Sequence, residues 1–447
     1  MRSRAFRRSS LFGVVAAVAL VTTGCWRVGN LDGPGTGSSG GRTGDAVNVD
    51  KSAAVASVGI YSVPVIAYAD PSSNRLRWGF DNLVLGWQFS DLDGPGVVGG
   101  AGRTSDNVGT FNSTSMGAAV GAGSRQADVY YFDSTQHLLR HAHFDGGNWT
   151  FESLDGPGVG GSAGQTSDLA GGSNASAFFN SQTHDLYRAE HTSLGKVGTQ
   201  SRLRHTWFDG QSWHFENVDG PGSTFVGHTD DNVGLHTAVQ VYNGAMHAFY
   251  YDSTAHSLRH AIYDGSTWTF ENLDGSTAGG GGGRVADDVG QYNATTTTPD
   301  GHLHVFYLDA TTNRLRHGDF DGTSWTFSDL DGPGVGGGNG RTGDTVGGYA
   351  ATASNAPGNV IDVFYADDVA HSLRHARFDG ATWTFETIDG TGALTLGSTR
   401  DQVGQFNAAG YGGNPVELHM WTGDLTSGNL RMGCTLGPLT APPATCS

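Results

Sequence analysis

Residues 268–275 read Trp-Thr-Phe-Glu-Asn-Leu-Asp-Gly, and residues 26–33 read Trp-Arg-Val-Gly-Asn-Leu-Asp-Gly. Large apolar residues alternate with polar ones ahead of the Asp-Gly pair, which predicts a half-buried β-strand that ends in a turn. The segment recurs about every 60 residues, and a fixed period of that length is typical of repeat folds such as propellers. Its tryptophans are Trp26, Trp87, Trp149, Trp213, Trp268, Trp325 and Trp383.

Three further markers follow the same period. Each Trp segment ends in a Leu-Asp-Gly aspartate or a close variant, and a second aspartate follows, usually in a Thr-x-Asp-x-Val context. A Leu-Arg pair stands farther on, so every marker occurs seven times. The Leu-Asp-Gly aspartates are Asp32, Asp93, Asp155, Asp219, Asp274, Asp331 and Asp389; the second aspartates are Asp45, Asp106, Asp168, Asp231, Asp287, Asp344 and Asp401; the arginines are Arg77, Arg140, Arg204, Arg259, Arg316, Arg374 and Arg431.

The unit from Leu330 to Thr387 shows the local structure of one repeat. Residues 346–353 alternate weakly, residues 360–365 are rich in β-formers, and residues 373–378 and 383–388 alternate cleanly. No stretch has a helical period. Four short antiparallel strands, A to D, repeated seven times predict an all-β, seven-bladed β-propeller with four-stranded blades.

The two ends of the chain provide a check on the blade count. The last unit has strands A to C, ending at Met432, but no Trp strand after them. Residues 26–33 match that missing strand, so we expect the N-terminal strand to complete the last blade and to remove an open sheet edge. The third unit is longer than the others between Asp185 and Ser201, which predicts a surface insertion between strands B and C.

The N-terminus and the cysteines predict export. Residues 1–24 have four arginines, then an apolar run, then Thr-Thr-Gly before Cys25, as in a lipoprotein-type signal peptide. Lipidation of Cys25 would anchor the chain in the membrane; ordinary cleavage nearby is the alternative. The predicted location is extracytoplasmic, at the cell surface, lipid-anchored or secreted. Cys434 and Cys446 predict a disulfide that pins a tail of residues 435–447 to a propeller of residues 26–434.

Composition and motifs argue against several functions. The chain has 25 Lys and Arg against 43 Asp and Glu, a net charge of −18, which excludes nucleic acid as a partner. Catalysis on a symmetric scaffold needs residues that break the repeat, and Glu190, His191, Glu417 and His419 are the main ones. No nucleophile-elbow, zinc-protease or phosphate-binding motif stands in a suitable context. We therefore predict no enzyme, no catalytic residue, no cofactor and no metal.

The repeated polar residues have two interpretations. In a four-stranded meander, the D-to-A and B-to-C connections lie on one face, here called the glycine-loop face, and the A-to-B and C-to-D turns lie on the other, the turn face. Arginine forks and carboxylates on the glycine-loop face suit the hydroxyls of a sugar. Alternatively, the arginines form a structural clasp with Thr-x-Asp carboxylates of a neighbouring blade. The predicted ligand-binding residues are Arg140, Arg204, Arg259, Arg316, Arg374, Asp106, Asp231, Asp287 and Asp344.

The aromatic and histidine repeats are expected to be structural. The tryptophans occupy alternating strand positions where packing between blades needs a large side chain. In five units one histidine occupies the same strand position and is expected to lie half-buried at a blade edge, where one copy per blade cannot form a metal cluster. These histidines are His141, His205, His260, His317 and His375.

The repeat resembles that of a known lectin family. Residues 362–367, read with Leu373-Arg374-His375, Phe378-Asp379-Gly380 and Trp383, resemble the repeat of seven-bladed bacterial lectins of the Photorhabdus type. More distantly they resemble the six-bladed fungal fucose-specific lectins. The resemblance implies binding of fucose or related sugars in pockets between blades.

Together these observations predict a cell-surface, non-catalytic and multivalent carbohydrate-binding propeller. Its partners would be glycans or cell-surface polysaccharide, with the membrane reached through the lipid anchor. The main alternative is a protein-interaction scaffold without a sugar pocket. A more distant alternative is an extracytoplasmic glycan hydrolase, whose activity would depend on Glu190 or His191.

Overall fold

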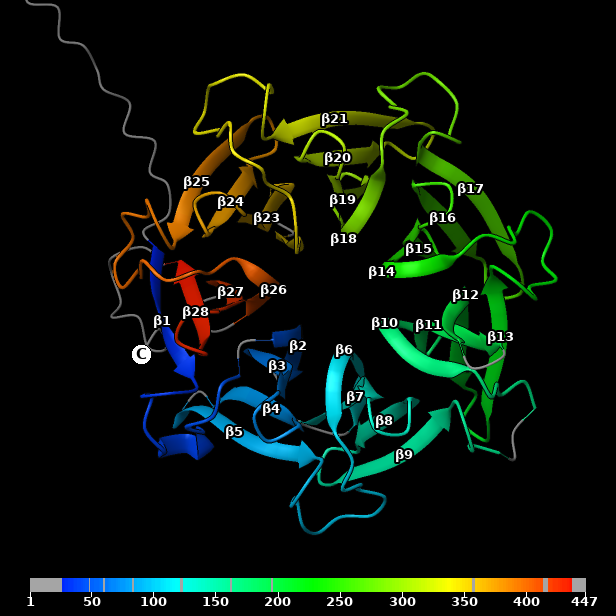
Figure 1. Cartoon of the computed structure of the whole chain (residues 1–447). Helices are drawn as coiled ribbons and strands as arrows, with labels where there is room; N and C mark the ends of the chain where they lie inside the picture. The colour runs from blue at the N-terminus through cyan, green and yellow to red at the C-terminus, as the bar shows by residue number, and fades with distance from the viewer. Residues whose placement is uncertain are drawn as a thin grey trace, which may run out of the picture.

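The computed structural model describes residues 26–435 apart from 48, 59–60, 83, 121–123, 161–162, 194–195, 356–357 and 413–416. These residues form seven four-stranded sheets arranged around a central axis (Figure 1). The predicted all-β, seven-bladed propeller is thereby confirmed. The predicted signal peptide, Cys25, Cys446 and nearly all of the C-terminal tail lie outside the described residues. Within the described part of the chain, no helix is long and apolar enough to cross a membrane.

The first three blades follow one another along the chain. Blade 1 contains β2 (Val49–Val58), β3 (Tyr61–Asp70), β4 (Arg75–Asn82) and β5 (Gly86–Asp93), and a short 3₁₀ helix, η1 (Ser39–Gly41), precedes it. Blade 2 contains β6 (Val108–Val120), β7 (Ser124–Asp133), β8 (Leu138–Phe144) and β9 (Trp149–Asp155). Blade 3 contains β10 (Leu169–Phe179), β11 (Gln182–Ser193), β12 (Lys196–Phe208) and β13 (Trp213–Asp219).

The remaining blades repeat the same meander. Blade 4 contains β14 (Val233–Tyr242), β15 (Ala245–Asp252), β16 (Ser257–Tyr263) and β17 (Trp268–Gly275). Blade 5 contains β18 (Val289–Thr297), β19 (Leu303–Asp309), β20 (Arg314–Phe320) and β21 (Trp325–Asp331). Blade 6 contains β22 (Ala351–Asn355), β23 (Val360–Asp367), β24 (Ser372–Phe378) and β25 (Trp383–Asp389). Blade 7 contains β26 (Gln405–Gly412), β27 (Glu417–Gly423), β28 (Leu430–Thr435) and the N-terminal β1 (Trp26–Asp32).

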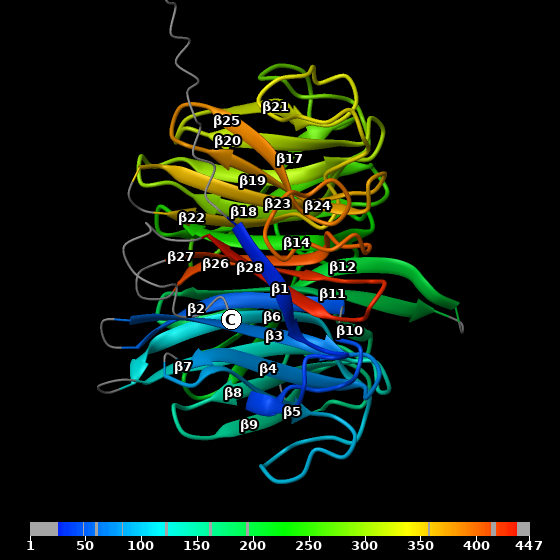
Figure 2. The same ribbon diagram turned by 90° about the vertical axis from the view of Figure 1, so that its left-hand side faces the viewer.

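The two ends of the described chain meet in blade 7, as predicted. Strand β1 pairs antiparallel with β28, and Trp26 lies opposite Thr435 (Figure 2). The sheet order β1-β28-β27-β26 therefore places the first described strand on the outside of the last blade. This pairing closes the ring with backbone hydrogen bonds and gives each blade the same four strands.

The hydrophobic core is divided among the seven junctions between neighbouring blades. Each of seven buried clusters draws its side chains from two adjacent blades. Between blades 5 and 6, for example, Phe306 and Leu315 pack with Tyr365 and Phe385. Full burial of one such side chain stabilises the fold by about 1.5–3 kcal/mol. The predicted structural role of the tryptophans is confirmed most clearly for the buried Trp26, Trp87, Trp268 and Trp325.

The glycine-rich D-to-A loops lie against strand D of the following blade. In the loop before blade 2, the Ala101 carbonyl accepts a hydrogen bond from the Phe151 N–H at 3.1 Å. Gly102 beside it has a φ of +85°, and a Cβ there would stand 1.8 Å from the Phe151 carbonyl oxygen. The contact between two backbones leaves no space for a side chain, which explains the periodic glycines.

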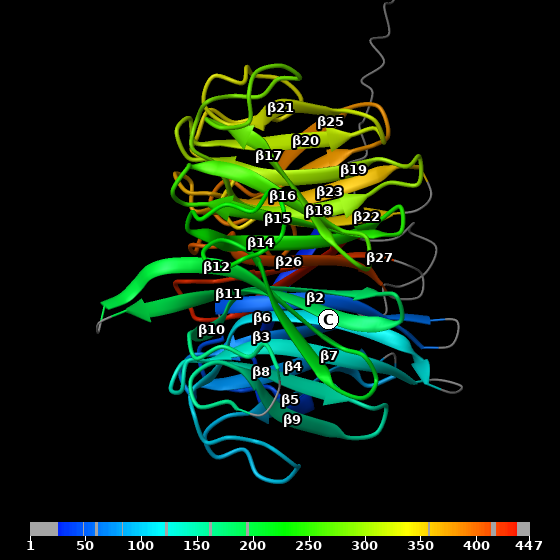
Figure 3. The ribbon, with the colours of Figure 1, turned by 90° about the vertical axis from the view of Figure 1, so that its right-hand side faces the viewer.

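The longer third unit extends an existing hairpin. Strands β11 and β12 are 12 and 13 residues long, and Figure 3 shows them projecting beyond their neighbours. The extra residues thus lengthen the B-to-C hairpin of blade 3, in agreement with the predicted position of the insertion.

Candidate functional site

The repeated arginines form clasps between blades. Between blades 1 and 2, Arg140 Nε lies 3.1 Å from Asp93 Oδ2, and Tyr131 donates to the same oxygen at 2.6 Å. Arg140 Nη2 also donates to the Gly102 carbonyl at 2.7 Å, so the guanidinium joins strand D of one blade to the loop that follows it. Backbone N–H groups of the loop satisfy the other carboxylate oxygen of Asp93.

The same clasp occurs at the other junctions. An arginine pairs with the Leu-Asp-Gly aspartate of the preceding blade, and in six of seven cases a tyrosine joins them; blade 7 has Thr422 at that position. The pairs are Arg77–Asp32, Arg140–Asp93, Arg204–Asp155, Arg259–Asp219, Arg316–Asp274, Arg374–Asp331 and Arg431–Asp389. The interpretation as a clasp agrees with this geometry, but the expected partner was wrong. The arginines contact the Leu-Asp-Gly carboxylates and not those of the Thr-x-Asp segments.

The predicted ligand-binding arginines are therefore not exposed. Arg140, Arg204, Arg259, Arg316 and Arg374 are only 2–5% exposed. Their guanidinium groups already donate to carboxylate and carbonyl oxygens of the protein. This burial corrects the expectation that these arginines face a ligand on the glycine-loop face.

The second aspartates lie apart from the arginine clasps. Asp106, Asp231, Asp287 and Asp344 are half-buried on the glycine-loop face. Burial and the charge of Asp106 raise the pKa of Asp133, and Asp231 acts similarly on Asp252. The Thr-x-Asp residues thus stand next to the carboxylates that end strand B. A role for these four aspartates in ligand binding stays a prediction.

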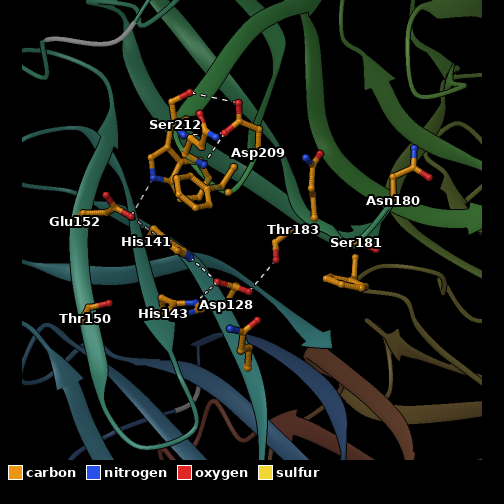
Figure 4. Close-up of a pocket in the computed structure, with 17 residues that line it drawn as sticks. Asp128, His141, His143, Thr150, Glu152, Asn180, Ser181, Thr183, Asp209 and Ser212 are labelled. Atoms are coloured by element: carbon orange, nitrogen blue, oxygen red, sulfur yellow. Dashed lines mark hydrogen bonds and ion pairs between the residues drawn. The ribbon is translucent and has the colours of Figure 1, made fainter. Parts of the chain in front are cut away.

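A pocket between blades 2 and 3 lies on the opposite face from the one predicted. A hollow of about 950 Å³ lies between blades 2 and 3. Its wall includes the A-to-B turn at Asn180 and the C-to-D turn at Asp209. These turns define the turn face. Blade 2 contributes Asp128, His141, His143 and Glu152 (Figure 4). Blade 3 contributes three aromatic side chains, Phe178, Phe208 and Trp213.

A continuous polar network forms the blade 2 wall of the pocket. Asp128 Oδ1 lies 2.8 Å from His141 Nε2 and 2.8 Å from His143 Nδ1. His141 Nδ1 lies 3.2 Å from Glu152 Oε1. From blade 3, Thr183 donates to Asp128 Oδ2 at 2.8 Å and Trp213 donates to Glu152 at 3.1 Å (Figure 4).

The two carboxylates control the charge of the network. Burial alone would lower the pKa of His141, but hydrogen bonds to Asp128 and Glu152 outweigh it and raise that pKa to about 9. Burial opposes ionisation of Asp128 as well, but His141 and His143 together hold its pKa well below the usual value. The wall is therefore a set of alternating charges next to an aromatic surface, which is suited to polar ligands.

Related groups recur at four other junctions, with different chemistry at each. The histidine of strand C contacts a strand B residue 13 to 21 positions earlier: His205 with His184, His260 with His247, His317 with His304 and His375 with Asp362. All these strand C histidines, and His141, are buried, whereas we expected them to be half-buried. The expectation that they stand alone was also wrong, because each has polar neighbours within its own blade.

Among the described residues, two groups have a geometry that suits a metal ion. Ligand atoms of Asp128, His141 and His143 lie within 4.8 Å of one another, and so do those of His302, His304 and Asp319. The prediction of no metal site rested on one histidine per blade and overlooked the acid and the second histidine beside it.

Other pockets also lie between blades. One of about 720 Å³ includes His247, His260 and Glu271 beside Trp325 at the junction of blades 4 and 5. A smaller one of about 240 Å³ includes His304 and His317 beside Trp383. The junctions therefore differ in size and lining although the scaffold repeats.

The residues that break the repeat do not form one site. Glu190 pairs with Arg188, and His191 Nδ1 lies 2.7 Å from Asp168 Oδ1 on the lengthened hairpin of blade 3. Glu417 and His419 lie on β27 in blade 7. The structure does not bring these two pairs together.

Comparison with known proteins identifies propellers at low similarity. No family model and no curated protein matches the chain. Among solved structures, a lectin of Aleuria aurantia in complex with α-methyl-L-fucoside is 15% identical, with a TM-score of 0.43, over 79% of this chain and 96% of that one. That lectin is described as a six-bladed β-propeller. The resemblance to lectins of the Photorhabdus type stays a prediction.

Glycoside hydrolases occur among the same matches. The Hadza microbial sialidase Hz136 is 10% identical, with a TM-score of 0.45, over 77% of this chain and 67% of that one. An α-L-arabinofuranosidase of Fusarium graminearum is 10% identical, with a TM-score of 0.40, over 72% and 92% of the two chains. Because the matched propellers include enzymes as well as lectins, the prediction that this chain is not an enzyme was wrong to exclude catalysis.

Proposed function

We propose that the chain binds carbohydrate in the pocket between blades 2 and 3, on the turn face. One observation supports this best: an exposed aromatic surface stands opposite a charged hydrogen-bonding wall in one pocket. Phe178 and Phe208 are 36% and 39% exposed, and both line the pocket, so each ring offers an apolar surface there. Stacking of a sugar C–H face on these rings would leave its hydroxyls toward Asp128 and His143.

The differences between the junctions determine how many sugar-binding sites we propose for the ring. We propose that the blade 2–3 pocket is the principal site and that the pocket of about 720 Å³ between blades 4 and 5 is a second, weaker one. Two or more sites on one rigid ring would gain avidity on a glycan-coated surface. Seven equal sites are not part of this proposal, because the lining residues are not repeated.

The test is a glycan array with the mature chain, followed by titration of the best sugar. Removal of the aromatic contact in Phe208→Ser should weaken binding about tenfold, since one stacked ring contributes roughly 1.5 kcal/mol. Val226→Ser is the control, because Val226 is 95% exposed and lies outside the pocket. Equal affinity of Phe208→Ser and Val226→Ser would refute the site.

A second comparison separates the pocket from the clasp. Arg140→Gln should lower stability without changing the affinity for sugar, because Arg140 is buried on the other side of the blade. Each sample is also assayed for released monosaccharide, so that hydrolysis by the same pocket is recorded. An array with no bound sugar would favour the protein-interaction scaffold.

We propose that the chain acts outside the cytoplasm and is held at the membrane by a lipid on Cys25. The sequence before Cys25 supports this, as does the acidic composition of an exported protein. Cys25→Ser should release the chain from the detergent phase of a Triton X-114 partition.

We further propose a disulfide between Cys434 and Cys446. Peptide mapping without reductant would detect the linked pair.

A further inference from the structure

We infer that Asp128, His141 and His143 form a binding site for a divalent transition-metal ion in the pocket between blades 2 and 3. The three side chains stand on two neighbouring strands, β7 and β8, and point toward one another (Figure 4). His141 and His143 are two residues apart on β8, so both project from the same face of the sheet. Two imidazoles and one carboxylate are a ligand set that suits zinc and its neighbours in the first transition row.

The spacing of the ligand atoms fits an ion. Asp128 Oδ1 now lies 2.8 Å from a nitrogen of each histidine. Around a tetrahedral zinc ion with bonds of about 2.0–2.1 Å, neighbouring ligand atoms stand about 3.3 Å apart. Opening these two contacts by about 0.5 Å would therefore admit the ion. The fourth coordination position would face the pocket and remain available for water or a ligand.

The outer partners of these groups are already in place. Glu152 lies 3.2 Å from Nδ1 of His141, which leaves Nε2 for the ion. Thr183 donates to the second oxygen of Asp128, and Trp213 donates to Glu152. Carboxylates behind histidine ligands are the usual second shell of protein metal sites, because they fix the ring and its tautomer. Asp128 and His141 are 7% and 5% exposed at their side chains, so packing holds these two ligands in place, whereas His143 is 32% exposed on the pocket side.

Blade 6 shows what occupies the same place when the second histidine is missing. Asp362, His375, Glu386 and Trp26 repeat the arrangement of Asp128, His141, Glu152 and Trp213. Opposite Asp362 on the neighbouring strand stands Arg377, whose Nη1 lies 2.8 Å from Asp362 Oδ1. The position that holds a fixed cation in blade 6 thus holds a potential ligand in blade 2, where His143 lies opposite Asp128.

The other candidate group is less suitable. His304 Nδ1 lies 3.0 Å from His317 Nε2, and His304 Nε2 lies 3.0 Å from the Thr298 hydroxyl. Both nitrogens of this ring are engaged within the blade. An ion at Nδ1 would displace the contact with His317, which is not a member of that group. At His141 the ion would open only the Nε2 contact with Asp128, which is itself a ligand of the proposed site.

The test exchanges the two side chains that distinguish the blades. The mature chain is stripped with chelator, titrated with Zn²⁺ by calorimetry and analysed for metal content. We expect one zinc equivalent that binds with Kd on the order of 1 µM or tighter. His143→Arg should remove that equivalent, and Arg377→His should add one. Blade 6 already accommodates arginine at this position, so His143→Arg should keep the parent unfolding midpoint.

Two further variants complete the design. Glu152→Gln should weaken zinc binding about 10–100-fold, as expected for an outer partner. His137→Gln, an exposed histidine on the glycine-loop face of blade 2, should bind zinc like the parent. Absence of zinc binding in the parent, or zinc retained in His143→Arg, would overturn the inference. These measurements use no sugar, so their outcome is independent of the proposed function.

Discussion

The clasp predicts a large difference between two arginines on one strand. Arg316 is 2% exposed at its side chain and pairs with Asp274, which is fully buried. Arg314 stands two residues earlier on β20 and pairs with Asp329, with side chains 27% and 25% exposed. Removal of one partner of a buried ion pair costs about 3–5 kcal/mol, because the other charge is left without compensation. An exposed pair contributes about 0–1 kcal/mol.

We therefore expect Arg316→Met to lower the free energy of unfolding by about 3–5 kcal/mol. The variant loses both guanidinium bonds to Asp274, the bond to the Gly283 carbonyl and a bond to Asp329, the carboxylate that Arg314 also contacts. Tyr307 and two backbone N–H groups still contact the carboxylate, which favours the lower part of that range. Arg314→Met is the matched control and should cost about 1 kcal/mol or less.

Urea unfolding followed by tryptophan fluorescence measures both variants under the same conditions. We expect the two losses of free energy of unfolding to differ by at least about 2 kcal/mol. Equal losses, or a larger loss for Arg314→Met, would show that the buried clasp does not hold the blades together.

Two further predictions concern the loops and the buried histidines. Thermal unfolding should show that Gly102→Ala is far more destabilising than Gly99→Ala. Both glycines have positive φ, a conformation that alone costs alanine about 1–2 kcal/mol, but only Gly102 also faces a backbone oxygen. Burial and the charge of His260 lower the pKa of His247 to about 3, so this ring stays neutral in the fold. The neutral ring contributes fully to the free energy of unfolding above the unfolded pKa of about 6.5. That contribution is lost as pH falls toward 3, by up to about 1.4 kcal/mol per pH unit. Acid unfolding of His247→Gln should be correspondingly shallower, and an unchanged pH profile would contradict the shift.

The sequence predicted the fold because its markers report on packing that every blade needs. The tryptophan of strand D, the Leu-Asp-Gly turn and the Leu-Arg pair recur with each blade, and the unmatched strand at residues 26–33 identified the closure. The pairing within the clasp was not predictable, because two aspartates per unit stand within reach of each arginine along the chain. Only the structure shows that the Leu-Asp-Gly carboxylate points into the junction, whereas the Thr-x-Asp carboxylate stays on the loop.

The candidate site was missed because it depends on residues that are not repeated. Strand B is apolar at most inward positions, yet Asp128, His184, His247, His304 and Asp362 are polar at one equivalent position. That run of buried polar residues, opposite a histidine of strand C, was the available signal. The markers that all blades share pointed instead to the arginines and to the glycine-loop face. Divergence at one position of strand B is what distinguishes one junction from the next.

The location of the pocket changes what an anchored ring would bind. Strand β1 begins at Trp26 on the turn face, since strand D follows the C-to-D turn, and the pocket between blades 2 and 3 opens on that face. A lipid on Cys25, one residue earlier, would hold the turn face toward the membrane. The pocket would then meet glycans of the cell's own envelope, while the glycine-loop face would point outward. Externally added glycan beads should therefore bind the released Cys25→Ser protein better than whole cells that display the anchored form. Stronger binding by the whole cells would mean that the ring stands the other way.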